Sequence, residues 1–229
     1  IDKTAIRDAA TVIVLRDRAA TPKVLMGQRG AKAAFMPNKF VFHGGAVDAG
    51  DADVPLLAPL PGLCQSRVRE NSPTDLSHAL AIAAIRELWE ETGLPLGRAA
   101  HWPVSPSADW TGFAAEGLLP AADQLQVLFR ASTPPGRPRR FDARFFLVDA
   151  CHIKGDLDDF SSASEELSHL QWVPLAEARA LDLPFITESV LAETEARAAD
   201  PAPPASVPFY KNNDEESLFL RMYGQSQPM

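Results

Sequence analysis

Residues 81–94, with the sequence AIAAIRELWEETGL, carry the feature that most constrains the fold of this chain. The apolar side chains of this segment recur at helical spacing, because at about 100° per residue they fall within one arc of roughly 120°. The arc consists of Ala81, Ile82, Ile85, Leu88 and Trp89. The spacing predicts an amphipathic helix over His78–Thr92 that packs this arc on a core, with Gly93 as the residue that ends it.

Three carboxylates lie on nearly the opposite side of the same helix. Glu87, Glu90 and Glu91 stand in its last turn, where the helix dipole disfavours each anion by roughly 0.3–1 kcal/mol. Arg86, four residues before Glu90, offers local compensation. One interpretation is a solvated acidic face, and the other is a site for a divalent cation, which prefers hard oxygen ligands. The spacing alone leaves both interpretations open.

Short β-rich segments surround this helix in the sequence. We expect strands at Thr11–Leu15, Lys23–Gln28, Lys39–Phe42, Leu125–Phe129, Phe141–Val148 and Leu170–Val173. Further helices are expected to start at Pro174–Leu181 and to cover Ile186–Ala199. Residues 52–77 contain four prolines and no strong period, which predicts a loop or insertion. Interleaved strands and helices favour an α/β fold in which a mixed sheet has helices on both faces.

Charge and composition restrict the classes of partner. The balance of 22 Lys and Arg against 30 Asp and Glu gives a net charge of −8, which argues against a nucleic-acid polymer as partner. No run approaches 18 apolar residues, so we expect no membrane span. The two cysteines fit neither a disulfide framework nor a metal site, which favours reduced thiols in the cytoplasm. The start, Ile1-Asp2-Lys3, has neither an initiator Met nor a signal segment, so we expect the natural chain to begin earlier.

Together with its neighbours, the acidic helix resembles the signature of the Nudix hydrolase family, G-x5-E-x7-R-E-U-x-E-E-x-G-U, in which U is a bulky apolar residue. Residues 86–94, RELWEETGL, match the second half at every fixed position. The first half is similar to residues 44–51, GGAVDAGD, in which Asp51 stands at the Glu position and Asp48 where many members carry another acid. The resemblance covers roughly residues 8–180 and implies the Nudix fold, a mixed sheet sandwiched between helices.

The sequence departs from this signature in three places. Thirty-four residues separate Asp51 from Arg86, where the pattern has seven. His43 stands where members commonly have Pro, and the Asp at 51 is one methylene shorter than the usual Glu. His43 lies beside the glycine pair and is interpreted as a packing substitution, with a place in the site as the alternative. A subgroup similar to peroxisomal coenzyme A diphosphatases carries an insertion at this place, and it also has a segment similar to residues 138–142, PRRFD.

The length of 229 residues allows one domain with additions or two small domains. The layout of the motif favours the first alternative. We expect a single domain over residues 1–200 with its insertion at about 52–77. Residues 201–206, PAPPAS, predict a stiff linker, and a hairpin from Val207–Tyr210 and Ser217–Met222 is expected after it. Residues 201–229 are therefore expected to form a C-terminal linker and extension.

The resemblance implies a Mg²⁺- or Mn²⁺-dependent hydrolase that cleaves the diphosphate bond of a nucleoside diphosphate linked to another group. It implies that Glu87 and Glu91 bind the metal, with Glu90 as a third ligand and the Gly45 carbonyl completing the set. Arg86 would hold these carboxylates in place rather than touch the substrate.

A general base must reach the attacking water directly or through one other water. In several Nudix groups the base comes from a loop before a late strand, which makes Glu166 the first candidate here and Glu165 the second. A solvated acidic loop is the alternative for either residue. Arg139 and Arg140 belong to a group of four arginines within residues 137–144 that would clamp phosphates or form an exposed basic turn. Arg29 and Lys39 are further candidates for phosphate contacts.

Coenzyme A or its acyl esters lead among the expected substrates, followed by ADP-ribose or NADH-like dinucleotides. A noncatalytic Nudix-fold module that binds a nucleotide is the alternative from another class. Intact Glu87, Glu90 and Glu91 argue against it, because a sensor need not retain three carboxylates that repel one another. The oligomeric state is left open, with a homodimer among the alternatives.

Overall fold

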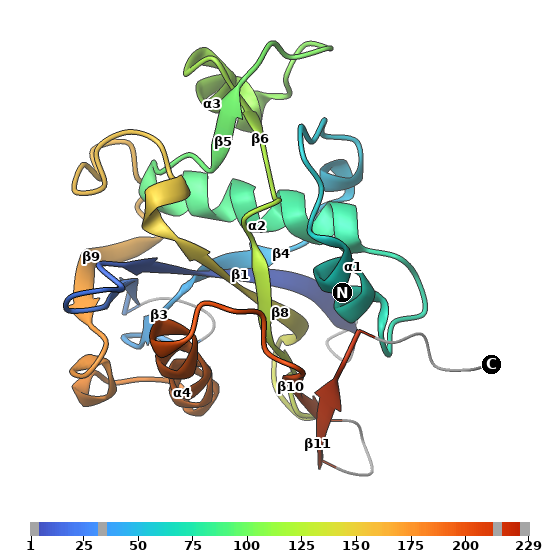
Figure 1. Cartoon of the computed structure of the whole chain (residues 1–229), viewed down its shortest axis with the longest axis vertical. Helices are drawn as coiled ribbons and strands as arrows, with labels where there is room; N and C mark the ends of the chain where they lie inside the picture. The colour runs from blue at the N-terminus through green and yellow to red at the C-terminus, as the bar shows by residue number, and fades with distance from the viewer. Residues whose placement is uncertain (1–4, 32–35, 213–216, 225–229) are drawn as a thin grey trace.

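The computed structural model describes residues 5–31, 36–212 and 217–224, and within them the main feature is one nine-stranded mixed sheet (Figure 1). Its strands are β1 (Ile6–Arg16), β2 (Lys23–Arg29), β3 (Phe40–Val41), β4 (His43–Ala46), β7 (Gln126–Ser132), β8 (Arg140–Asp149), β9 (Leu167–Pro174), β10 (Val207–Asn212) and β11 (Ser217–Met222). They run in the order β11-β10-β7-β8-β1-β2-β3, with β4 paired to β1 and β9 paired to β2. The strands β5 (Gly97–Ala99) and β6 (Leu118–Pro120) form a separate small sheet.

Helices cover both faces of the large sheet. The helices α1 (Gly62–Arg69) and α2 (Ser77–Thr92) pack on one face, and α4 (Phe185–Ala199) packs on the other (Figure 1). The short helix α3 (Thr111–Ala115) lies beside β6 at one end of the molecule. This arrangement confirms the predicted α/β fold, a mixed sheet between helices. No helix in the described part of the chain is long and apolar enough to cross a bilayer.

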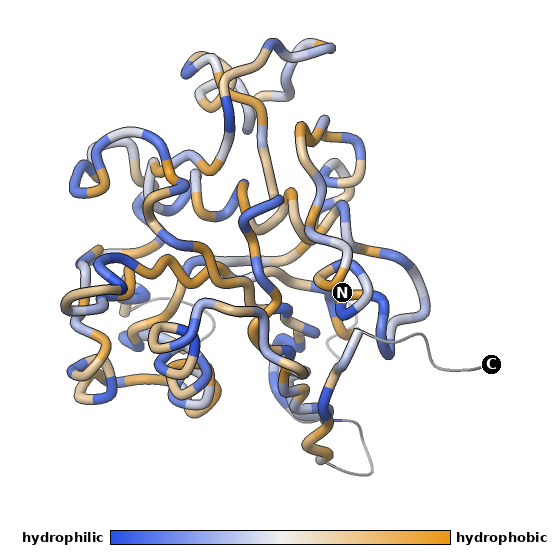
Figure 2. Tube along the Cα trace, viewed as in Figure 1, coloured by the Kyte–Doolittle hydropathy of each residue, from blue (hydrophilic) through white to orange (hydrophobic). Residues whose placement is uncertain are grey.

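The strand β1 lies at the centre of the sheet, where it pairs in parallel with β8 from Ile6 to Leu15. Its alternating residues serve two cores: Val12 and Val14 pack on the α2 side, whereas Ile13 and Leu15 pack on the α4 side. Figure 2 shows hydrophobic stretches along these central strands. The strand begins earlier than predicted because β8 supplies hydrogen-bond partners to its polar first half.

The acidic helix is α2, and its predicted apolar arc is buried except for Trp89, which is half-buried. Gly93 ends the helix with a φ of 74° and donates its N–H to the Trp89 carbonyl at 2.8 Å. A residue in the left-handed conformation is sterically strained unless it is glycine. Gly93 can therefore adopt it, which explains the abrupt end of the helix. Both predictions for this segment are confirmed.

Two sequence predictions require correction. Residues 52–77 were expected to be a loop or an insertion, and the loop alternative is wrong because they contain α1, whose Cys64 and Val68 are buried. The apolar face of α1 is masked in the sequence by Arg67, which is also buried and donates to the Pro204 carbonyl. The helix expected to start within Pro174–Leu181 is a single 3₁₀ turn, Ala178–Ala180, because β9 extends to Pro174 and uses the first of these residues.

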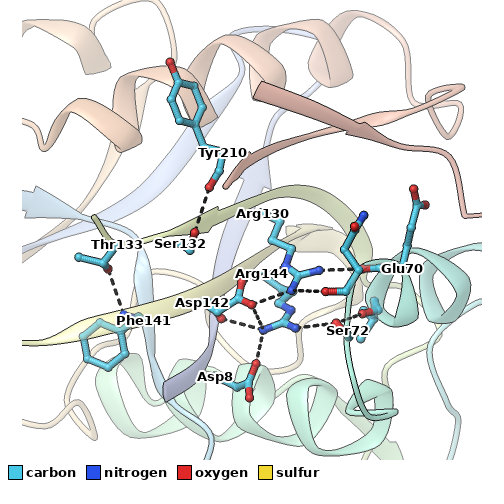
Figure 3. A network of polar contacts seen from close by, with 12 residues as sticks. Asp8, Glu70, Ser72, Arg130, Ser132, Thr133, Phe141, Asp142, Arg144 and Tyr210 are labelled. Carbon is cyan, nitrogen blue, oxygen red and sulfur yellow. Dashed lines mark hydrogen bonds and ion pairs between the residues drawn. The ribbon is translucent and has the colours of Figure 1, made fainter. Parts of the chain in front are cut away.

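A buried ion network ties the end of α1 to the sheet (Figure 3). Asp142 on β8 accepts hydrogen bonds from Arg130 at 2.9 and 2.6 Å, and its Oδ2 lies 3.4 Å from Arg144. Arg144 also bonds Asp8 on β1 and the Ser72 hydroxyl. Arg130 donates to two backbone carbonyls just after α1. The residues just after α1 are therefore anchored directly on β7 and β8, and Arg144 connects them to β1 through Asp8.

The chain beyond residue 200 adds strands to the same sheet. The strand β10 pairs in parallel with β7 through Phe209 and Tyr210, and β11 forms the outer edge. The Arg130 guanidinium lies 4.2 Å from the centre of the Phe209 ring. After β11, the Gly224 N–H donates to the Glu70 side chain at 2.8 Å. The C-terminal residues and the insertion therefore contact each other directly.

Candidate active site

The glycine pair on β4 brings that strand into unusually close contact with its two neighbours. A Cβ at Gly44 would lie 2.3 Å from the Ala10 carbonyl oxygen of β1. A Cβ at Gly45 would lie 2.2 Å from Oε1 of Glu87 on α2. Both distances are far below van der Waals contact. At Gly44 the obstructing atom belongs to the backbone of β1, so only glycine fits, whereas at Gly45 the Glu87 carboxylate would have to move.

Arg86 forms the centre of the acidic cluster. Its side chain is 7% exposed, and its Nε and Nη2 donate to the two oxygens of Asp51 at 2.9 and 3.1 Å. Nη1 donates to Glu87 at 2.9 Å and to Glu90 at 3.2 Å, and Nη2 donates to the Ala46 carbonyl at 3.0 Å. The predicted pairing with Glu90 is confirmed. Arg86 also contacts Glu87, and it contacts Asp51 and the Ala46 carbonyl, which precede the insertion in the sequence.

Asp51 provides the rigid half of this arrangement. It is buried in the 3₁₀ turn η1 (Ala49–Ala52) and also accepts the Asp48 N–H at 2.8 Å. Its planar fork with Arg86 is the geometry in which guanidinium and carboxylate bind most specifically. The shorter side chain at this position thus holds Arg86, a contact that the sequence left undefined.

Glu91 is held by a different set of groups. Its side chain is 3% exposed, and its Oε2 lies 3.2 Å from Nδ1 of His43 and accepts the Gly44 N–H at 3.1 Å. The His43 ring is fully buried, and its Nε2 has no hydrogen-bond partner among the described residues. His43 therefore contacts Glu91 of the candidate site directly, which favours the alternative that it lies in the site over a packing substitution.

Burial and mutual repulsion shift the ionisation of the cluster. Burial, with a further contribution from the Glu91 charge, raises the pKa of Glu87 to about 7, although Arg86 opposes the shift. Burial also raises the pKa of Glu90. The negative charges are thus incompletely compensated, and hard oxygen donors beside a glycine backbone suit Mg²⁺ or Mn²⁺. The donor chemistry fits such a cation.

No three acidic, histidine or cysteine side chains already converge as a ligand set within residues 5–31, 36–212 and 217–224. Glu87 and Glu90 point to Arg86 instead, while Glu91 points to β4. The assignment of these carboxylates to a metal stays a prediction.

The candidate base Glu166 lies on the loop before β9 and is exposed. Its Oε1 is 3.5 Å from Arg29 at the end of β2, so two candidates from distant parts of the sequence meet. The same loop reaches α2, because the Ser164 N–H donates to the Glu90 carbonyl at 2.9 Å. Glu165 is also exposed on this loop. The structure thus places the loop beside the last turn of α2.

The other cationic candidates lie in different surroundings. Lys39 pairs with Asp182. Arg139 is exposed, whereas Arg140 is buried at the start of β8 and donates to the Thr133 carbonyl at 3.3 Å. Gly45 and Arg140 both pair with residues of β1, and their two partner positions on β1 are four residues apart. At ~3.3 Å per residue, these positions are separated by roughly 13 Å along the sheet.

A cavity of about 490 Å³ opens beyond the C-terminal end of α2. Trp89 and Gly93 form its helix side, Arg98 its β5 side, and Lys154 and Ser162 its loop side. The sequence assigned Trp89 to the core from its helical spacing alone. Spacing does not distinguish a core residue from one at the end of a helix that also lines a cavity.

The fold and the donor set define a class of α/β protein in which a carboxylate-bearing helix lies against a glycine pair on a strand. No family model matches the chain. It is 31% identical over 180 residues to putative nudix hydrolase 7 of Caenorhabditis elegans, covering 73% of this chain and 51% of that protein. It is 30% identical over 210 residues to acyl-coenzyme A diphosphatase NUDT19 of Gallus gallus, covering 68% and 55%. The chain thus spans about half the length of these relatives.

A solved NUDIX hydrolase from Alicyclobacillus acidocaldarius has the same fold, with a TM-score of 0.60 and 27% identity over 86% of this chain and 96% of that one. The chain belongs to the Nudix hydrolase family. Members of this family act on pyrophosphate bonds of nucleoside diphosphate derivatives.

If Glu87 binds a metal, as the resemblance implies, replacing Gly45 by alanine should lower kcat/KM roughly 10- to 100-fold, the range typical when the support of a metal ligand is disturbed. The added Cβ would displace the Glu87 carboxylate, which lies 2.2 Å from its position. Gly50→Ala is the matched control, because a Cβ there meets nothing within 4 Å. The two variants are compared by steady-state kinetics, and equal activity would contradict the role given to Gly45.

Proposed function

We propose that the protein is a divalent-cation-dependent hydrolase that cleaves the diphosphate bond of a nucleotide-containing small molecule. One observation carries this proposal: Glu87 and Glu91, one helical turn apart, both lie against the backbone of the glycine pair on β4. This arrangement concentrates anionic oxygens where they repel one another, and a bound Mg²⁺ or Mn²⁺ relieves that repulsion.

The metal would be held by Glu87, Glu91 and Glu90, with the Gly45 carbonyl as a further ligand. When bound, it polarises the phosphoryl oxygens and lowers the pKa of a coordinated water. Arg86 keeps two of these carboxylates in place by donating to both from Nη1. Glu166 is the proposed general base, with Glu165 as the second candidate. The exposed position of Glu166 on the loop beside α2 allows it to accept a proton from an attacking water.

Coenzyme A or an acyl-coenzyme A is the proposed substrate class. Support comes from the similarity to a protein named acyl-coenzyme A diphosphatase and from the insertion between Asp51 and Arg86. Arg29, Lys39, Arg139 and Arg140 are the proposed phosphate contacts. Of these, Arg29 has the strongest support, because it lies beside Glu166. The proposal also includes a cytoplasmic location. A homodimer is the proposed alternative to a monomer, and analytical ultracentrifugation distinguishes the two.

A substrate panel tests this function. The protein is incubated with Mg²⁺ or Mn²⁺ and coenzyme A, acyl-coenzyme A, ADP-ribose, NADH or nucleoside triphosphates, and products are separated by chromatography. We expect metal-dependent cleavage of coenzyme A that is abolished by EDTA. Cleavage of ADP-ribose alone would overturn the substrate class. Tight ligand binding without turnover of any compound would overturn the enzyme assignment in favour of a nucleotide-binding regulator.

Mn²⁺ should also stabilise the folded protein, because it would bind the native cluster and not the unfolded chain. At 100 times its Kd, a ligand adds about 2.7 kcal/mol, which for a domain of this size raises Tm by roughly 5–10 °C. Glu87→Gln should lose most of this increase. Thermal unfolding followed by circular dichroism measures it, and an undiminished increase in Glu87→Gln would remove Glu87 from the ligand set.

A further inference from the structure

The residue before the glycine pair is a histidine in an unusual position for that side chain. The His43 ring is fully buried, and its Nδ1 lies 3.2 Å from Oε2 of Glu91. The Gly44 N–H donates to the same oxygen at 3.1 Å. Two neighbouring groups of β4 therefore converge on one oxygen of a single carboxylate.

Glu91 depends on these groups because Arg86 does not reach it. The side-chain ion pairs of Arg86 within the described residues go to Asp48, Asp51, Glu87 and Glu90. His43 is thus the side chain that holds Glu91. Oε1, the other oxygen of Glu91, accepts no hydrogen bond from the described residues, so it is the oxygen available to a ligand.

We infer that His43 is a positioning residue: its Nδ1–H, together with the Gly44 N–H, fixes Oε2 of Glu91 and orients Oε1 toward a divalent cation. This inference rests on the proposed function. A carboxylate oxygen that already accepts the Gly44 N–H can only accept again, so Nδ1 must carry the proton. Nε2 has no hydrogen-bond partner among the described residues. Proline, the residue common at this position of the signature, supplies no side-chain donor, so Gly44 would hold Glu91 alone.

Two substitutions separate the hydrogen bond from simple packing. His43→Asn keeps an N–H donor near the position of Nδ1, whereas His43→Leu fills the apolar space without a donor. The Mn²⁺ affinity of the free protein is measured by electron paramagnetic resonance at constant pH. We expect the leucine variant to bind Mn²⁺ at least about 10-fold more weakly, as is typical when an outer hydrogen-bond partner of a ligand is lost. The asparagine variant should stay close to the wild type.

His78→Leu is the matched control, because His78 is exposed on α2 and its Nε2 contacts the Val54 carbonyl rather than a carboxylate. It should bind Mn²⁺ as the wild type does. Unchanged affinity in His43→Leu, or equal loss in His43→Asn, would overturn the inference while the proposed function stands. A wild-type protein without Mn²⁺ affinity would overturn both.

A measurement on the wild type covers the case in which His43→Leu does not fold. Nitrogen-15 NMR of the histidine rings reports which ring nitrogen carries the proton. We expect the buried ring of His43 to be protonated at Nδ1 in a hydrogen bond to Glu91. A ring protonated only at Nε2 would overturn the inference whatever the metal affinity.

Discussion

Glu91→Gln should lower kcat/KM roughly 10³-fold, the largest expected effect of a single substitution on activity. The amide oxygen of glutamine can still accept the hydrogen bonds of His43 and Gly44, so the local fold should persist. The NH₂ group then replaces the anionic oxygen proposed to bind the metal. A metal supplies several kcal/mol of transition-state stabilisation, and about 4 kcal/mol corresponds to a factor of roughly 10³.

Steady-state kinetics on the substrate that the panel identifies measures this effect. Glu188→Gln on α4 is the matched control, because Glu188 is exposed on the opposite face of the sheet and should leave activity unchanged. Circular dichroism and thermal unfolding establish that both variants fold. Activity in Glu91→Gln comparable to that of Glu188→Gln would remove Glu91 from the reaction.

Arg86→Leu should destabilise the protein by about 3–5 kcal/mol, the cost of removing one partner from a buried ion pair. The substitution leaves the buried Asp51 carboxylate without its guanidinium, and Glu87 and Glu90 lose the cation between them. Their mutual repulsion then opposes folding. Urea denaturation at neutral pH measures the loss in the free energy of unfolding.

Arg179→Leu is the control for this measurement. Arg179 and Glu195 form an ion pair at 3.1 Å with both side chains about half exposed, and such pairs contribute only about 0–1 kcal/mol. Arg86→Lys should recover part of the stability, since lysine keeps the charge and loses the fork to Asp51. If Arg86→Leu were no more costly than Arg179→Leu, the carboxylates would have to be stabilised by solvent rather than by Arg86.

The elements that local patterning specifies are the ones that the sequence predicted well. The helix α2, its buried arc and its end at Gly93 follow from the spacing of apolar residues and from one left-handed glycine. The same spacing placed Glu87, Glu90 and Glu91 together on one side. Such features depend on residues within a few positions of one another, so one helical period is enough to find them.

Other features were not predicted from the sequence, because their stability comes from contacts with residues far away in the chain. The helix α1 buries Arg67, and a charged residue on the inner face conceals the amphipathic pattern. Arg144 belongs to the arginine group that was interpreted as a phosphate clamp or an exposed basic turn, yet it is buried between Asp8 and Asp142. No local pattern indicates that pairing, because Asp8 is 136 residues away in the chain.

By itself, the sequence determined that a helix with three carboxylates in its last turn would follow a glycine pair, and that the fold would be a mixed sheet between helices. Only the tertiary structure decided how those carboxylates are held. Asp51 reaches Arg86 across the insertion, and His43 reaches Glu91 from a strand. The physical reason is that a helical period sets which side chains share a face, whereas hydrogen-bond partners and burial depend on which segments the folded sheet brings together.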